Sequence, residues 1–412
     1  MRQFIHWALV SSIFLFGLTS FANAYLPFFD QEQLTSFFGL CMFIFALIHL
    51  PVRKKMLPFS IVLLAVLIQL IYMEEPLAQV LWDGLRRMES LIALLIVVPM
   101  VGWILAEEPY IEALVAFFSK ALYTSKRFYL WVMSITQLVS YFLLFGSIPL
   151  VYQFVQRIVG TRQGESWDYF KSTAISRGFA LSACWVISMP SFAVAIDSMG
   201  ASLGLAIIQG FFLSSVGIGL AILFFIFRER KHLTGLNEGI RQEIKRVMPS
   251  EADSKYFRRL VLEFICLFFS LFGMVLLLNY LLDWNLLRII PLVVFCWTLG
   301  YYVIKRKLNV MADKGKQYIS AGLITRAPEM TILLAAGVLI HALQVSGIGY
   351  ALVELLFKLT TYVPLLNPLM ILPFVLVILG FIGLGPLTVM VLVGGILQSI
   401  HLPYPPELIV LT

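Results

Sequence analysis

The sequence predicts an all-α polytopic membrane protein. Of its 412 residues, 60% are hydrophobic and only 13% are charged, whereas a soluble protein carries about 25% charged residues. The apolar residues form runs close to the roughly 20 residues that a helix needs to cross a bilayer. This composition excludes a soluble enzyme, a nucleic-acid-binding protein and a disordered regulator.

Nine apolar runs are clear candidates for membrane-spanning helices. They are 5–24, 35–50, 56–73, 88–106, 178–199, 202–227, 260–282, 286–304 and 329–347. Two further apolar stretches, 128–156 and 365–400, are interrupted at Gly146–Pro149 and Gly383–Pro386. Glycine and proline disrupt a helix interior, and a break at membrane depth is tolerated only where protein or water covers it. We expect both stretches to form re-entrant hairpins.

The first 34 residues allow two interpretations. Arg2, an apolar run and Ala22-Asn23-Ala24 are typical of a cleavable signal peptide. The alternative is an uncleaved first helix, which we favour because the next span follows closely and no polar secreted domain follows it.

Basic residues predict the orientation of the chain, because Lys and Arg collect in cytoplasmic loops. With the N-terminus inside, 26 of the 30 lysines and arginines fall on the cytoplasmic side. They lie at Arg2 and in 51–55, 107–127, 157–177, 228–259 and 305–327. The exceptions are Arg86, Arg87, Arg288 and Lys358. The net charge of +7 therefore indicates orientation and not a nucleic-acid partner.

The chain contains an internal repeat. Residues 89–123 read ESLIALLIVVPMVGWILAEEPYIEALVAFFSKALY, and residues 329–362 read EMTILLAAGVLIHALQVSGIGYALVELLFKLTTY. The breaks in the two hairpins follow each copy at nearly the same offset. The pair of spans before the first copy is joined by basic residues, and the pair before the second by Asp283-Trp284, so the halves are inverted. Inverted repeats with broken helices are characteristic of secondary transporters.

These features divide the chain into four parts. We expect an N-terminal helix over 1–34, a first inverted repeat over 35–227, a basic cytoplasmic linker over 228–259 and a second repeat over 260–412. Against the first repeat, the second lacks a broken span and a last span. We therefore expect an incomplete sequence, with a degenerate second half as the alternative.

This arrangement resembles the ion transporter superfamily, which includes divalent-anion/sodium symporters and the large membrane subunit of TRAP transporters. The resemblance covers nearly the whole chain, but it is one of architecture and rests on no signature motif. It implies a substrate site between the two hairpin tips and the broken span that follows the first. The residues implied are Gly146, Ser147, Pro149, Ser182, Ser188, Pro190, Gly383, Gly385, Pro386 and Thr388. The chain has no Asn in either tip where the anion symporters carry a Ser-Asn-Thr motif, which puts both dicarboxylate and sodium in doubt.

Two ionisable residues within spans are candidates for ion or proton coupling. Asp197 follows the break in 178–199, and His341 lies deep in 329–347. Ionisable groups inside a membrane are costly and indicate function by default. The alternatives are an interfacial carboxylate and a histidine that is simply hydrogen-bonded. The serines at the breaks have an alternative too, because their hydroxyls could bond back to their own helices. Arg86 and Arg87 also allow two interpretations: they either attract anions or lie on an interfacial helix over 77–87.

The sequence thus predicts a permease that moves a small anionic or polar solute by alternating access. We expect it in a bacterial-type cytoplasmic membrane, with a solute or ion, membrane lipid and a second copy of the chain as partners. No catalytic residue, metal site or cofactor is predicted. The alternatives are a transporter-like protein with a structural, assembly or regulatory role, and an intramembrane transferase, for which the chain lacks an evident acid–base pair.

Overall fold

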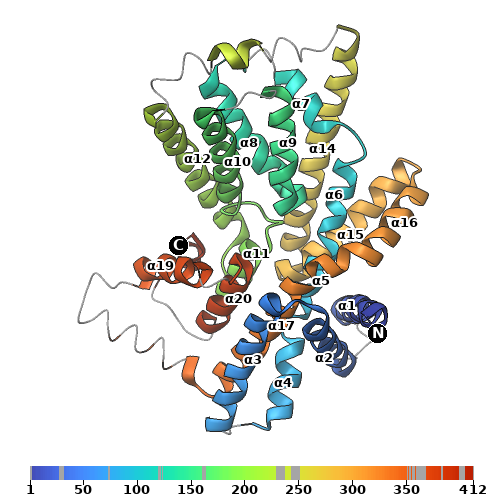
Figure 1. Cartoon of the computed structure of the whole chain (residues 1–412), viewed down its shortest axis with the longest axis vertical. Coiled ribbons are helices and arrows are strands. Elements are labelled where there is room, and N and C mark those ends of the chain that lie inside the picture. Colours follow the sequence, from blue (N-terminus) through green and yellow to red (C-terminus); the bar gives the residue numbers. More distant parts are fainter. Residues whose placement is uncertain are drawn as a thin grey trace.

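The computed structural model describes residues 2–26, 32–72, 75–118, 122, 124–159, 164–228, 237–242, 251–349, 351, 354, 358, 368–381, 384–398 and 404–411. In this part of the chain every regular element is a helix (Figure 1). Eight of these helices or helical runs are long and apolar enough to cross a membrane. The chain is therefore an all-helical, multi-pass membrane protein, as its composition predicts.

Most helices follow the predicted spans. The predicted span 178–199 is instead divided between the end of α10 and the short α11, and it is not among the eight long apolar helices. The N-terminal part comprises α1 (Arg2–Tyr25), α2 (Glu32–His49), α3 (Val52–Tyr72), α4 (Leu77–Arg86), α5 (Glu89–Val97), α6 (Pro99–Leu105) and α7 (Tyr110–Phe118). The middle part comprises α8 (Ser125–Leu143), α9 (Ser147–Val159), α10 (Glu165–Ser182), α11 (Pro190–Met199) and α12 (Leu203–Arg228). The C-terminal part comprises α14 (Glu251–Leu282), α15 (Leu286–Ile304), α16 (Leu308–Gln317), α17 (Leu323–Val345), α19 (Pro368–Phe381), α20 (Pro386–Leu397) and α21 (Pro406–Leu411).

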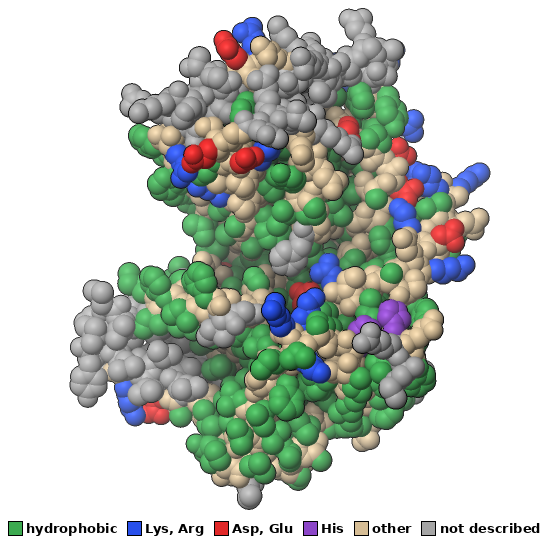
Figure 2. Space-filling model, viewed as in Figure 1, with side chains coloured by type: hydrophobic (Ala, Val, Ile, Leu, Met, Phe, Trp, Pro, Cys, Tyr) green, Lys and Arg blue, Asp and Glu red, His purple; other side chains and the backbone are tan. Residues whose placement is uncertain are grey.

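The helices form two groups with a middle layer between them. In Figure 1, α8, α9, α10 and α12 stand together in the upper part, while α3, α4 and the end of α17 form the lower part. Helices α11 and α20 pack against each other between these groups. Hydrophobic side chains cover most of the visible face of both groups, and the surface is hollowed between them (Figure 2).

The interruptions predicted from Gly and Pro lie where helices end. A single 3₁₀ turn, Leu144–Gly146, joins α8 to α9, and these two helices pack side by side. Residues 183–189 separate α10 from α11 without regular helix, and α19 ends at Phe381 before α20 begins at Pro386. Proline suits the first turn of a helix because its missing N–H has no partner there, which explains why Pro190 and Pro386 start helices.

Helix α4 belongs to the packed bundle. It continues through α5 and α6 as one apolar run, Leu77–Leu105, and it packs along α17. Glycine makes the close approach of α4 and α17 possible: a Cβ on Gly84 would lie 2.5 Å from the Cα of Val338. A Cβ on Gly337 would in turn overlap the carbonyl oxygen of Gly84. Residues far apart in the sequence thus meet backbone to backbone.

An ionic cluster joins the end of α6 to α15 and α16. The Glu107 carboxylate accepts hydrogen bonds from Lys314, from Lys307 at 3.1 Å and from the Tyr302 hydroxyl at 3.3 Å. Lys314 also donates to the carbonyl oxygen of Trp103 at 2.9 Å. Burial alone would raise the pKa of Glu107, but the hydrogen bonds from the two lysines outweigh it and lower that pKa.

This cluster predicts a pH-dependent contribution to stability. A carboxylate whose pKa is lowered by folding stabilises the protein above its unfolded pKa, and the contribution is lost as the pH falls through the folded value. Glu107→Gln should therefore lower the unfolding temperature by a few degrees near neutral pH. The gap from the parent should begin to narrow near about pH 4, the unfolded pKa, and should close only as the pH falls further, through the lowered pKa of Glu107. Thermal unfolding of the purified protein in detergent measures both. A gap that is constant with pH would contradict the account.

Candidate functional site

The residues predicted at the first hairpin tip have mostly local partners. The Ser147 hydroxyl donates to the carbonyl oxygen of Leu144 at 2.6 Å and lies 2.8 Å from the Ser140 hydroxyl. Ser147 is fully buried, whereas Gly146 and Pro149 are exposed. Leu144 has a φ of +50°, a region that costs energy for a side chain such as leucine. The tip is a tight turn whose hydroxyl is already engaged.

The break between α10 and α11 is held in a similar way. The Ser182 hydroxyl donates to the carbonyl oxygen of Phe179 at 2.6 Å, and Ser188 donates to the carbonyl oxygen of Tyr141. Pro190 is buried at the first position of α11. Helix α12 lies directly against this segment, because a Cβ on Gly210 would overlap the carbonyl oxygen of Cys184. The predicted serines therefore satisfy backbone carbonyls on α8 and α10.

The residues predicted in the second half lie at the start of α20. Gly385 and Pro386 are exposed, and Thr388 is buried in the first turn. Gly383 lies outside the residues that the structure describes. Helix α20 packs on one side against α11 and on the other against α17. The second break thus positions α20 beside the helix that follows the first break.

Asp197 connects α11 to the start of α15. Its two carboxylate oxygens accept hydrogen bonds from the backbone N–H groups of Leu286, at 3.0 Å, and Leu287, at 2.9 Å. A carboxylate at a helix N-terminus satisfies N–H groups that have no partner within the helix and interacts favourably with the helix dipole. Asp197 is therefore anchored to α15.

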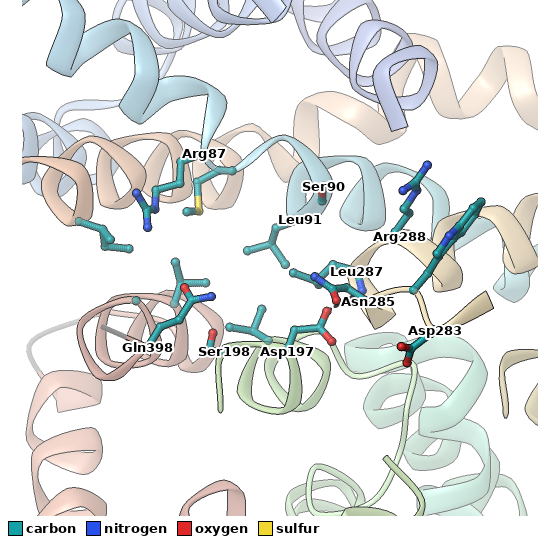
Figure 3. A pocket seen from close by; sticks show the side chains of 16 residues that line it. Arg87, Ser90, Leu91, Asp197, Ser198, Asp283, Asn285, Leu287, Arg288 and Gln398 are labelled. Atoms are coloured by element: carbon teal, nitrogen blue, oxygen red, sulfur yellow. Dashed lines mark hydrogen bonds between the residues drawn. The ribbon is translucent and has the colours of Figure 1, made fainter. Parts of the chain in front are cut away.

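A cavity of about 550 Å³ lies beside Asp197. One wall comes from α11 and α20, the two helices that follow the breaks; the other comes from the α4–α5 junction, α15 and α17. Its lining residues are Arg87, Met88, Ser90, Leu91, Val194, Asp197, Ser198, Asp283, Trp284, Asn285, Leu287, Arg288, Ile340, Val391, Gly395 and Gln398. In Figure 3, Arg87 points into the open space from one side, and Gln398 and Ser198 lie on the other.

The charged groups of this cavity differ in how they are paired. Arg288 donates to the carbonyl oxygen of Ala24, and its guanidinium lies 3.9 Å from the centre of the Trp284 ring; Figure 3 shows it turned away from Arg87. Asp197 is satisfied by the start of α15. Among the described residues, no carboxylate lies within 4.0 Å of the Arg87 guanidinium, whereas the neighbouring Arg86 pairs with Glu32. The lining thus carries two arginines, Arg87 and Arg288, and two aspartates, Asp197 and Asp283. Of the two arginines, Arg87 is the one whose guanidinium has no hydrogen-bond or ion-pair partner among the described residues.

His341 has a different environment from Arg87. Its Nε2 lies 3.6 Å from Oε2 of Glu75, in the segment between α3 and α4. The next residue along α17 toward the N-terminus, Ile340, lines the cavity. Of the two predicted coupling candidates, Asp197 therefore lines the cavity. His341 does not line it but is the neighbour of Ile340, which does.

Of the residues that line this cavity, the sequence singled out Asp197 as a coupling candidate and offered anion attraction as one of two interpretations of Arg87. It did not point to Ser198, Gly395 or Gln398. Ser198 follows Asp197, and Gln398 is a polar residue at the end of an apolar run, so both carried a weak signal. Their role depends on the packing of α11 against α20, which brings together positions about 200 residues apart. Comparison with protein-family models, curated proteins and solved structures found no match for this chain.

Proposed function

We propose that this chain is a secondary transporter that moves a small anionic solute across a bacterial-type cytoplasmic membrane, and that the cavity around Arg87 is its solute site. The observation that carries the proposal is the unpaired guanidinium of Arg87 in a cavity between two sets of helices. Arg87 is exposed to the open cavity, so its charge and its hydrogen-bond donors are available to a solute.

The chemistry of the cavity suits an oxyanion such as a sulfate, phosphate or carboxylate group. A guanidinium forms paired hydrogen bonds with two oxygens of such a group. The Ser198 hydroxyl and the Gln398 amide lie opposite Arg87 and offer further donors (Figure 3). The cavity volume of about 550 Å³ lies within the range of roughly 300–1,000 Å³ that small-molecule sites occupy. Two carboxylates, Asp197 and Asp283, also line the cavity, but the Asp197 oxygens already accept from the start of α15. The donors that face the open space therefore favour an anion.

The arrangement of the walls supports alternating access. Helices α11 and α20 follow the two breaks, and each break frees its helix from a continuous hydrogen-bonded ladder. We expect α11 and α20 to move together against α4, α5, α15 and α17, so that the cavity opens first to one side and then to the other. In this account the breaks act as hinges, and the cavity side chains bind the solute.

The distribution of basic residues predicts which side the cavity faces. The turn at 283–285 and the segment after α11 lie on the side with few lysines and arginines. With the N-terminus in the cytoplasm, both are extracytoplasmic. The described conformation then presents the solute site toward the outside of the cell.

Exchange across liposome membranes tests this proposal. The purified full chain is reconstituted into liposomes loaded with unlabelled sulfate, phosphate or succinate, and entry of the same radiolabelled anion is followed. We expect entry of at least one anion well above that in protein-free liposomes. A chain that exchanges none of these anions, or that exchanges only cations or neutral solutes from a matched panel, would contradict the proposal.

A further inference from the structure

A second group of polar atoms lies behind the cavity, between α3, α17 and the segment before α4. It consists of Gln69 in the last turn of α3, Glu75 just before α4, and His341 in the last third of α17. Gln69 is 2% exposed, and its amide nitrogen donates to the backbone carbonyl oxygen of Glu75. This bond fixes the backbone of Glu75 against the end of α3.

Each of the three side chains has a buried polar atom without a hydrogen-bond partner: Oε1 of Gln69, Oε2 of Glu75 and Nε2 of His341. Buried polar groups in folded proteins are nearly always paired, because an unpaired group loses its bonds to water without replacement. Three such atoms in one place indicate a site prepared for a ligand. The 3.6 Å between His341 Nε2 and Glu75 Oε2 is slightly longer than a hydrogen bond.

The ligand that fits this site is a proton. A carboxylate can only accept a hydrogen bond, and an imidazole nitrogen donates only when it carries a proton. With one proton added, Nε2 donates to Oε2 of Glu75 and the pair becomes an imidazolium–carboxylate pair with no net charge. On release, the imidazole is neutral, and a carboxylate with a buried, unpartnered oxygen remains. A sodium or divalent ion would need several more oxygen ligands, and no cluster of three metal-ligating side chains occurs among the described residues.

Other charged groups lie on the helices that pack against α17. Those on the neighbouring α2, α4 and α5 are Glu32, Asp83, Arg86, Arg87 and Glu89, and α20 carries none. Arg86 pairs with Glu32, and Arg87 projects into the cavity. Among the described residues, Glu75 is the carboxylate at ion-pair distance from His341.

The proton site is connected to the cavity wall through α17. Ile340 lines the cavity, and its side chain packs against Gly395 of α20. One turn further on, the Gln344 amide donates to the carbonyl oxygen of Gly395 at 3.0 Å. His341 lies between these two contacts. A change in its charge and in its distance from Glu75 therefore acts on the segment of α17 that holds α20.

We infer that His341 and Glu75 bind the proton whose movement drives solute transport, and that Gln69 positions Glu75 through its hydrogen bond to the Glu75 backbone carbonyl. This inference rests on the proposed function. The proton binds when the site faces one side of the membrane and is released when α11 and α20 have moved, so that one proton crosses with each transport cycle.

Proton movement in liposomes tests the inference. The full chain is reconstituted with a pH-sensitive dye inside, and the anion found active in the exchange assay is added outside. We expect the wild type to show anion-dependent proton movement. Glu75→Gln and His341→Gln should abolish this movement and uphill uptake driven by a pH gradient, yet keep anion exchange close to the wild-type rate. Glu75→Asp should restore part of the proton movement.

Matched controls are Glu32→Gln, a carboxylate at the same end of the bundle, and His49→Gln, at the other end of α2. Both should behave like the wild type, and thermal unfolding in detergent shows whether each variant folds. A wild type that exchanges anions without moving protons would overturn the proton site alone. Variants that lose exchange and proton movement equally would overturn it as well. A wild type that exchanges no anion would overturn the proposed function itself.

Discussion

Replacing Gly84 with alanine is expected to destabilise the protein severely. A Cβ at this position would lie 2.5 Å from the Cα of Val338 and 3.1 Å from its backbone nitrogen. These neighbours are backbone atoms, so no side chain can rotate away, and α4 must move from α17. Overpacking of this kind typically costs about 1–3 kcal/mol, and here it also disturbs Gly337, which faces Gly84. Thermal unfolding in detergent and the yield of monodisperse protein measure the effect.

The matched control is Gly273→Ala on α14, where nothing lies within 4 Å of the added Cβ. Alanine in a helix is more favourable than glycine by up to about 1 kcal/mol, so this variant should be as stable as the parent or slightly more stable. A Gly84→Ala variant that unfolds at the parent temperature would show that α4 and α17 do not approach as closely as described.

Hydropathy predicted the helices well because the physical requirement is local. A span needs a run of apolar residues, and its ends need polar or turn-forming residues, so α12 (Leu203–Arg228) and α15 (Leu286–Ile304) lie within a residue or two of their predicted bounds. The breaks were predictable for the same reason. Proline and glycine act on their own segment of the backbone, whatever surrounds them.

Side-chain roles were harder to predict because they depend on distant neighbours. The sequence left open whether Ser182 and Ser188 bind a ligand or bond to backbone carbonyls, and the structure has them bonded to Phe179 and Tyr141. The contact of α4 with α17 also joins segments that are distant in the sequence, and the position of 77–87 relative to the membrane interface stays a prediction. The cavity itself requires the contact of α11 with α20, which no local pattern encodes.

Two predictions about chain organisation remain as they were. The inverted repeat and the re-entrant path of α8–α9 and α19–α20 concern symmetry and position in a membrane, which helix packing alone does not establish.

The linker predicted over 228–259 is described in part: 237–242 is helical, and residues from 251 onward are the start of α14. The basic residues at its end thus belong to the helix that continues into the next apolar span.

Replacing Arg87 with glutamine is expected to abolish most anion exchange while leaving the fold intact. The side chain projects into the cavity, and no carboxylate within 4.0 Å among the described residues depends on it, so its loss leaves no buried charge unpaired. A hydrogen bond to a charged group contributes about 1.5–3 kcal/mol, and each 1.4 kcal/mol is about a factor of ten in affinity. Anion exchange at low concentration should therefore fall by about tenfold to a hundredfold.

Arg87→Lys keeps the charge but loses the paired geometry of the guanidinium, and it should retain part of the exchange. Arg86→Gln is the matched control, because Arg86 is the adjacent arginine but pairs with Glu32 and does not line the cavity. It should exchange anions like the wild type. Equal unfolding temperatures for the three variants and the wild type would show that differences in exchange arise at the site.

The central claim is that the cavity around Arg87 binds the transported anion, and exchange by these variants tests it most directly. We expect Arg87→Gln to lose exchange, Arg87→Lys to be intermediate and Arg86→Gln to match the wild type. Exchange by Arg87→Gln at the wild-type rate, or an equal loss in Arg86→Gln, would contradict it.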